Sequence, residues 1–211
     1  GVIDWALDNA DAIRLVSFLP VAPAGRTRDQ RAQDLDLDGV WALICRGAGQ
    51  ALNRDALRFG HRECNITVPV VVVHSDSRRR LVEVVRADRV WDRRIMRRAL
   101  REFASGLHVD QGLAHTIRRL LVALLLRPPT LIELIGYGLY RAWTERATIF
   151  GLLGAAITGQ RLTLRPQLQV THRFMGAAEI DTELGRQRLA ACVFRVPVDG
   201  EMVSMCEVNA G

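Results

Sequence analysis

Lysine is absent from this sequence, so all 29 residues of its lysine-plus-arginine total are arginine. A GC-rich genome explains that bias better than a chemical requirement does, and arginine enrichment by itself therefore predicts no function. Long hydrophobic runs are absent as well. The longest run in the middle of the chain, residues 120–126, has seven residues, whereas a membrane-spanning helix needs about 20. No signal peptide opens the chain, so we expect a soluble, cytoplasmic protein.

The remaining composition is that of an ordinary globular protein. With 211 residues, 49% hydrophobic and 25% charged, the chain can bury one good-sized core or two small ones. These values exclude a disordered chain, a collagen-like repeat and a disulfide miniprotein. The four cysteines, at positions 45, 64, 192 and 206, are expected to be metal or cluster ligands, or core thiols, ahead of disulfides, because the cytoplasm is reducing.

The net charge of +6 is concentrated in one segment. Between Arg78 and Arg101 the sequence has ten arginines and three acids, a local charge of +7, so the rest of the chain carries about −1. A patch of this density attracts phosphates, anionic lipid headgroups or acidic protein surfaces, and salt weakens such binding. The alternative is a solvated helix face without a partner.

The first sixty residues predict a single helix–strand–helix arrangement. We expect a helix over Val2–Asn9, a strand over Ile13–Val21, and a second helix that begins at Asp36 or Asp38 and runs towards Ala51. Apolar residues on both faces of the strand indicate a buried strand of a parallel sheet. Because one such unit cannot close an α/β domain, we expect its partner strands to lie outside the sequence.

From residue 64 onward the pattern changes to hairpins and helices. Two β-branched runs, Ile66–Val73 and Leu81–Val85, predict a hairpin in which Pro69 places the first strand at an edge. The Arg-rich helix expected over Arg89–Phe103 should bury Trp91 and leave its arginines in solvent. The other predicted elements are helices over Leu113–Leu126 (ended by Pro128 and Pro129), Thr130–Glu145 and Thr148–Ile157, an extended Leu162–His172, a helix over Ala177–Ala191, and a hairpin over Val193–Val208 that turns at Asp199-Gly200.

Three cysteines and one histidine form the best candidate for a metal site. Cys192 and Cys206 flank the C-terminal hairpin, whose paired strands return the chain to its starting point and so can bring both sulfurs to one end. Two thiolates there would suit a soft metal or an iron–sulfur cluster. Cys64 is the best third ligand, with His61 three residues before it. Cys45, inside a predicted helix, is expected to be a core thiol, and the other three could be core thiols too.

Catalytic and nucleotide-binding sites have weaker support in the sequence than the metal site. His172 follows a predicted strand and could be a ligand, a catalytic base or a hydrogen-bonded core histidine, of which we expect the last. Walker loops, GxGxxG fingerprints and GxSxG elbows do not occur in the sequence. As far as motifs can decide, this excludes nucleotide-loop and hydrolase classes.

Three stretches, which cover about a third of the chain, resemble a known family. Ile13–Arg26, with Phe18-Leu19-Pro20-Val21 and the final Gly25-Arg26, is similar to a late barrel strand and its loop in radical S-adenosylmethionine (radical SAM) enzymes, within the subgroup that includes tetraether lipid synthases. Gly60-His61-Arg62-Glu63-Cys64-Asn65 resembles the Gly-His-Pro-x-Cys-Asn element of that subgroup, with Arg62 in place of proline. The C-terminal stretch resembles the closing segment of that subgroup, although Met205 departs from its pattern. The stretch contains Phe174-Met175, Asp181, Arg188, Cys192, Pro197-Val198-Asp199-Gly200 and Met205-Cys206-Glu207-Val208-Asn209.

The resemblance implies an α/β chain in two parts. Residues 1–58 would be the remnant of a partial (β/α) barrel, and residues 59–211 an α+β C-terminal module that holds an auxiliary 4Fe-4S cluster. Within the module, the resemblance implies a hairpin and Arg-rich helix over residues 59–104, a helical block over residues 105–160 and a Cys hairpin segment over residues 161–211.

The resemblance also implies a ligand set. Cys64, Cys192 and Cys206 would hold the auxiliary cluster, and the fourth position would be taken by His61, Cys45, a residue outside the sequence, or no protein group. Among these, His61 or an open position is favoured. Arg26, at the end of the barrel-strand loop, becomes a candidate cofactor-binding residue.

The three-cysteine CxxxCxxC loop that ligates the radical-generating cluster of this family does not occur in the sequence. We therefore expect the chain to be the C-terminal part of a longer enzyme and, by itself, not to cleave S-adenosylmethionine; the other possibility is that the gene has lost its first half. The full enzyme would use S-adenosylmethionine, a second 4Fe-4S cluster, and a reducing partner such as ferredoxin or flavodoxin. Methyl transfer, C–C coupling and dehydrogenation of an organic substrate all stay open.

Two alternatives concern the middle of the chain. Residues Leu120–Ile157 could form a wall for a lipid-like substrate, with the Arg-rich segment receiving an anionic headgroup or a membrane surface, or they could simply pack the module. The alternative function is a zinc-stabilised binding module that docks an anionic partner or nucleic acid through Arg93, Arg94, Arg97 and Arg98. Nucleic acid is the less expected partner, because no exposed aromatic platform is evident near this patch.

Overall fold

The computed structural model describes residues 1–20, 36–57, 59–75, 78–103, 118, 122, 125 and 127–210. The chain is a mixed α/β protein and divides into two compact units. Unit 1 comprises Gly1–Val84 and Thr163–Gly211, and unit 2 comprises Val85–Leu162.

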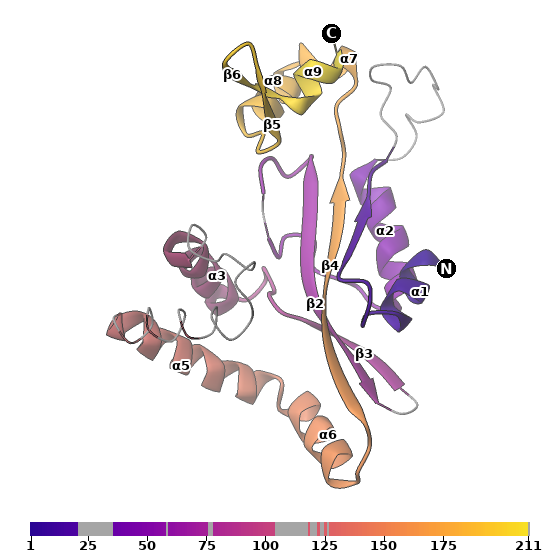
Figure 1. The fold of residues 1–211 in the computed structure, drawn as a ribbon, viewed down its shortest axis with the longest axis vertical. Helices are drawn as coiled ribbons and strands as arrows, with labels where there is room; N and C mark the ends of the chain where they lie inside the picture. Colours follow the sequence, from indigo (N-terminus) through magenta and orange to yellow (C-terminus); the bar gives the residue numbers. More distant parts are fainter. Residues whose placement is uncertain are drawn as a thin grey trace. The chain divides into compact units, whose positions relative to one another are not determined.

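A mixed four-stranded sheet, in the order β1-β4-β2-β3, forms the centre of unit 1 (Figure 1). β1 (Leu15–Phe18) runs parallel to β4 (Leu162–His172), whereas β2 (Asn65–Ser75) and β3 (Arg78–Glu83) form an antiparallel hairpin. The predicted hairpin is therefore confirmed. The parallel partner of β1 comes from the C-terminal third of the same chain, so the expectation that this partner lay outside the sequence is wrong.

The hydrophobic core of unit 1 is built around β2, whose run of β-branched residues suits a strand buried on both faces. Val68, Val70 and Val72 are at most 1% exposed, and burying each side chain of this kind stabilises the fold by about 1.5–3 kcal/mol. Two helices, α1 (Val2–Asp8) and α2 (Leu37–Ala48), pack on each other and lie side by side in Figure 1. Both helices were predicted.

The start of α2 follows the capping rule that predicted it. Asp36 is the N-cap residue, and its carboxylate accepts a hydrogen bond from the Gly39 N–H at 2.6 Å. Val40, Trp41 and Ile44 then face the core. The helix therefore has the amphipathic pattern that its sequence indicates.

Two expectations about the strands are wrong. The strand expected over Ile13–Val21 is reduced to β1, and it is not buried on both faces, since Leu15 is 55% exposed. Pro69 lies in an interior strand, between β4 and β3, rather than at an edge. Pro69 lies opposite Val84, just past the end of β3, where its carbonyl accepts the Val84 N–H at 3.0 Å. Proline is tolerated there because the residue pairs of β2 with β3 begin at Val70 and Glu83, so the missing N–H falls outside them.

The C-terminal segment of unit 1 contains short helices and a hairpin. In chain order these are α7 (Ala177–Ile180), α8 (Glu183–Ala190), β5 (Arg195–Val198), β6 (Glu201–Ser204) and α9 (Met205–Ala210). The single helix predicted over Ala177–Ala191 is thus two, because the Thr182 hydroxyl accepts the Gly185 N–H at 2.9 Å and starts a new helix. The turn at Asp199-Gly200 is confirmed, with positive φ at both residues.

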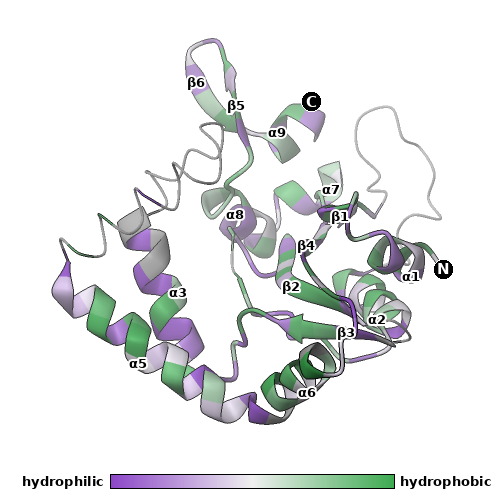
Figure 2. Cartoon of the chain, turned by 60° about the horizontal axis from the view of Figure 1, so that its bottom comes forward, coloured by the Kyte–Doolittle hydropathy of each residue, from purple (hydrophilic) through white to green (hydrophobic). Residues whose placement is uncertain are grey.

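Unit 2 is helical in the part that the structure describes, with α3 (Val90–Phe103), α5 (Pro128–Thr144) and α6 (Arg146–Ile157). Pro128 and Pro129 lie in the first turn of α5, where the helix needs no N–H from them. The helix predicted over Leu113–Leu126 falls almost entirely outside the described residues. Figure 2 shows hydrophobic residues along most of α6. No helix in the described ranges is long and apolar enough to cross a membrane.

The predicted division between residues 58 and 59 passes through the central sheet. β1 precedes it, and the other three strands of the sheet, including its only neighbour β4, follow it. The barrel remnant, the cluster module and this boundary remain predictions, whereas the mixed α/β architecture is established.

Candidate metal centre

One pocket of unit 1 is lined by Cys64, Cys192 and Cys206, the three cysteines predicted to be ligands. His61 and His172 line it as well. The pocket encloses about 340 Å³, part of it open to solvent, and the rest of its lining is mainly aromatic and apolar. The fold therefore gathers side chains from distant parts of the sequence into one small apolar space.

Cys64 reaches the pocket because it immediately precedes β2, beside the end of β4. There the Arg173 N–H donates a hydrogen bond to the Cys64 carbonyl at 2.8 Å. Gly60, with a φ of +75°, allows the loop before Cys64 to approach the end of α8 closely, since a Cβ at this position would lie 2.9 Å from the Ala191 carbonyl oxygen. Cys192 follows directly after Ala191, so this close approach brings the two cysteine-bearing segments together.

Cys206 enters the pocket from helix α9, not from the strand predicted for it. The hairpin before it still returns the chain, and the Met205 N–H donates to the Phe194 carbonyl at 2.9 Å. The buried Ser204 hydroxyl donates to Cys192 Sγ at 3.3 Å and accepts the Cys206 N–H at 3.2 Å. The reasoning that a hairpin brings both cysteines to one end is therefore confirmed, although the second strand is shorter than predicted.

A buried arginine accompanies Cys64. Arg188, on α8, is 1% exposed, and its Nε–H donates to Cys64 Sγ at 3.1 Å. The same guanidinium donates to the Arg173 carbonyl at 3.1 Å and lies 3.7 Å from the Glu179 carboxylate. A buried cation beside a thiol provides a counter-charge for the thiolate that a metal ion requires.

Burial, Arg188 and the other two cysteines act together on the Cys64 thiol. Burial raises the pKa of the Cys64 thiol, the hydrogen bond and charge of Arg188 lower it, and negative charge on Cys206 and Cys192 raises it; the net pKa is raised. Cys64 is therefore protonated at neutral pH, and a metal ion would have to displace its proton.

The two histidines of the pocket differ in their hydrogen bonds. His61 Nδ1 accepts the Glu63 N–H at 3.2 Å. His172 is 8% exposed, and its Nδ1 is buried without a hydrogen-bond partner among the described residues. Burial lowers the pKa of His172, and the charge of Arg188 lowers it further, so the ring is neutral at pH 7. The expectation of a hydrogen-bonded core histidine is thus wrong for Nδ1.

The donor set of the pocket fits a cluster, but its side chains are not at ligating positions. Within the described ranges, no three His, Cys, Asp or Glu side chains lie close enough together to hold a metal ion. Cys45 lies elsewhere, on α2, where its Sγ accepts the Leu52 N–H at 3.4 Å. Arg26, the predicted cofactor-binding residue, lies outside the described residues.

Sequence reasoning did not assign Arg188 or His172 to the site. Arg188 stands four residues before Cys192, a spacing that places two residues on one face of a helix and could have indicated their proximity. His172 had no local signal, since its role depends on where β4 ends relative to β2 and the hairpin.

The Arg-rich segment is more strongly paired than its sequence indicates. In unit 2, Arg94 and Arg98 on α3 both form ion pairs with Glu133 of α5. Trp91 is 41% exposed rather than buried, with Arg94 at 5.8 Å from its ring, because Asp92 occupies the buried position. These pairs reduce the positive charge that α3 presents to a partner.

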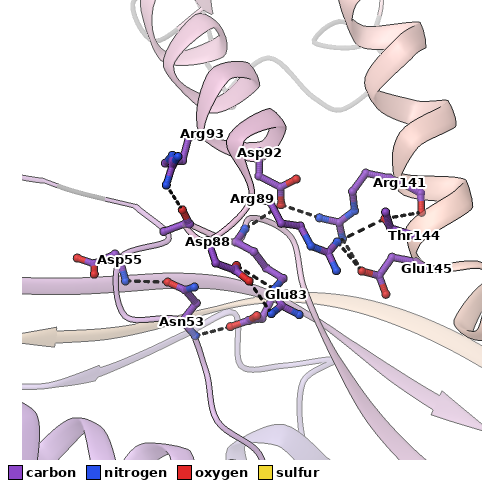
Figure 3. Close-up of polar contacts among 12 residues, drawn as sticks. Asn53, Asp55, Glu83, Asp88, Arg89, Asp92, Arg93, Arg141, Thr144 and Glu145 are labelled. Carbon is purple, nitrogen blue, oxygen red and sulfur yellow. Dashed lines mark hydrogen bonds and ion pairs between the residues drawn. The ribbon is translucent and has the colours of Figure 1, made fainter.

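Figure 3 shows how Oδ2 of the buried Asp92 is paired. The guanidinium of Arg141 on α5 points toward it, and Arg141 Nη1 lies 2.9 Å from Asp92 Oδ2. Nearby, Arg89 forms an ion pair with Glu145 at 2.7 Å. These two pairs join α3 to α5 and its C-terminal end within unit 2.

No protein-family model matches the chain, and no curated protein matches it.

Proposed function

We propose that this chain is the C-terminal, cluster-binding part of a radical SAM enzyme, in which Cys64, Cys192 and Cys206 ligate an auxiliary 4Fe-4S cluster. The observation that carries the proposal is the single pocket lined by all three of these thiols, which come from the start of β2, the end of α8 and helix α9. The enzyme class rests on the resemblance of three short motifs, whereas the cluster rests on the pocket.

The chemistry of the pocket supports this ligand set. Thiolates are the usual protein ligands of iron–sulfur clusters, and Arg188 would offset part of the charge that they bring. The apolar lining limits water around the ligands. A bound cluster would supply one-electron oxidation and reduction, at a potential set by its ligands, nearby charges and solvent access.

Anaerobic reconstitution of the full chain with iron and sulfide tests the proposal. We expect a brown protein with about four irons per chain and the spectroscopic signature of a 4Fe-4S cluster. Alanine at Cys64, Cys192 or Cys206 should each reduce the iron content. Alanine at Cys45 is the matched control, because this thiol lies outside the pocket, and it should leave the iron content unchanged. A colourless protein with less iron than one cluster requires would contradict the proposal.

The alternative function, a zinc-stabilised binding module, differs from the proposed one in its metal. The same reconstitution experiment therefore distinguishes the two functions. A chain that takes up one zinc ion in preference to iron, with no visible absorption, would favour that alternative. The ion pairs of Arg94 and Arg98 with Glu133 weaken the part of the alternative that uses α3 to dock an anionic partner.

We further propose that α5 and α6 contact an anionic membrane surface, in keeping with a lipid-like substrate. Large apolar side chains recur on exposed α5 positions at helical spacing, namely Ile132, Ile135, Leu139 and Trp143, each 56–71% exposed. On α6, Phe150, Leu153 and Ile157 repeat this pattern and are 51–85% exposed. Apolar stripes of this size are characteristic of interaction surfaces.

The charges beside these stripes favour an anionic bilayer as the partner. Glu133 and Glu145, the two acids of the segment, form ion pairs with arginines of the same unit. Arg146 is exposed and lies over the Trp143 ring at 4.9 Å, an arrangement suited to the boundary between headgroups and acyl chains.

Vesicle co-sedimentation tests this contact. The chain should bind vesicles that contain phosphatidylglycerol more strongly than vesicles of phosphatidylcholine alone, and salt should weaken the difference. Leu139→Glu should reduce binding, whereas Val2→Glu, at an equally exposed apolar helix position in unit 1, should not. Equal binding by the two variants would contradict the proposal.

A further inference from the structure

His172 occupies an unusual position at the end of β4. Its ring lies 4.6 Å from that of Phe174 and 4.4 Å from that of Phe194, so aromatic side chains fix its orientation on two sides. The side chain is more than nine-tenths buried, it lines the cysteine pocket, and its Nδ1 has no hydrogen-bond partner among the described residues. A buried polar atom without a hydrogen-bond partner destabilises the fold, and a ligand that pairs with it would remove that penalty.

His61, the histidine that the sequence favours as a ligand, is in a different state. Its Nδ1 accepts a hydrogen bond from the Glu63 N–H, and this nitrogen therefore carries no proton. In the neutral ring the proton must then be on Nε2. The lone pair of Nδ1 is already used and Nε2 has none to offer, so His61 cannot bind a metal ion without losing its loop contact.

We propose that His172 supplies the fourth protein ligand, through Nδ1, to the cluster held by Cys64, Cys192 and Cys206. This inference rests on the proposed function, and it replaces His61 or an open iron as the fourth position. Coordination would satisfy a buried nitrogen of the pocket that lacks a partner among the described residues. Histidine in place of cysteine also raises the potential of an iron–sulfur cluster, so the site would be easier to reduce than an all-cysteine one.

Pulsed electron paramagnetic resonance of the reduced, reconstituted full chain tests the assignment. We expect a strong nitrogen-14 coupling from a ligating imidazole in the wild-type protein. His172→Phe keeps a ring between Phe174 and Phe194 and should abolish this coupling. It should also lose iron to a chelator about tenfold faster or more. His61→Phe is the matched control in the same pocket, and it should keep both the coupling and the iron.

A second variant covers the case in which His172→Phe does not fold, which circular dichroism would reveal. His172→Cys provides a thiolate at the same position and should hold a cluster at a lower midpoint potential than the wild-type one, without the nitrogen coupling.

The outcomes separate this inference from the proposed function. A wild-type cluster without nitrogen coupling, unchanged by the His172 variants, would overturn the inference and leave the three-cysteine cluster standing; a water molecule would then be the partner of Nδ1. A coupling that disappears only in His61→Phe would also overturn it, in favour of His61. If the chain binds no cluster at all, the proposed function fails and this inference fails with it.

Discussion

At the scale of single residues, Arg188 has the greatest influence on the pocket. Its guanidinium contacts a thiol, a backbone carbonyl and a carboxylate while almost fully buried. Such a group stabilises the fold only as long as its partners remain in place, because the guanidinium is itself removed from water.

We predict that Arg188→Met destabilises the protein by about 2–4 kcal/mol, since the Arg173 carbonyl and the Glu179 carboxylate would lose a buried partner. The pKa of Cys64 should rise further, and its alkylation at pH 8 should slow. Urea denaturation and timed labelling with iodoacetamide measure the two effects.

Arg186→Met is the matched control on the same helix. Arg186 is exposed and pairs with Glu183 at the surface, so its removal should cost less than about 1 kcal/mol and leave Cys64 labelling unchanged. Equal effects of the two variants would show that Arg188 is not a buried partner of Cys64.

At the scale of elements, Gly60 controls the approach of two cysteine-bearing segments. The left-handed backbone at this position by itself costs an alanine about 1–2 kcal/mol. We predict that Gly60→Ala destabilises the chain by more than this, because the added Cβ would also meet the Ala191 carbonyl. It should also lower the iron content after reconstitution.

The control for Gly60 is Gly159→Ala. Gly159 has nearly the same φ, +73° against +75°, but a Cβ there would meet nothing within 4 Å. This variant should show the backbone strain alone and full iron content. If both variants bind equal iron, the close approach at Ala191 does not hold the site together.

The corner between α7 and α8 should be sensitive to acid through Glu179. Burial would raise the pKa of this carboxyl, but hydrogen bonds from Arg173 and the Gly176 N–H, with the charges of Arg173 and Arg188, hold it below its usual value of 4.5. The stabilisation is thus present above the unfolded pKa and is lost as the pH falls through the lower, folded pKa.

Glu179→Gln should therefore be less stable than the wild type at about pH 6, and the gap should narrow as the pH falls towards about 3. Urea midpoints measured across this range check the prediction. A gap that stays constant with pH would mean that the carboxylate charge does not contribute.

At the scale of the whole molecule, the chain consists of two compact units whose interiors are stabilised differently. The core of unit 1 is the valine-rich β2, whereas unit 2 contains an ion pair between the buried Asp92 and the half-buried Arg141. Removing Arg141 would leave the buried Asp92 carboxylate without its counter-charge, which destabilises a fold strongly.

Arg141→Met should therefore loosen unit 2 selectively. In hydrogen-exchange mass spectrometry, the amides of α3 and α5 should lose protection while those of β2 and β4 retain it. Arg146→Met, at an exposed position just after α5, should change neither. Uniform loss of protection in both units by Arg141→Met would show that they unfold as one.

The sequence by itself determined the elements whose signals are local. The Asp36 cap, the β-branched runs of the β2–β3 hairpin and the Asp199-Gly200 turn all act within a few residues, and each was predicted correctly. The return of the C-terminal hairpin also correctly indicated that Cys192 and Cys206 lie at one end. These features depend on backbone conformation and capping, which neighbouring residues decide.

Only the tertiary structure decided what depends on pairing between distant segments. β4 lies between β1 and β2, and this made Pro69 interior and brought the end of β4 to Cys64. The same pairing placed His172 and Arg188 at the pocket, although no local pattern distinguishes them from other buried residues. Strand order and burial follow from the free energy of the complete core, to which residues far apart in the chain contribute together.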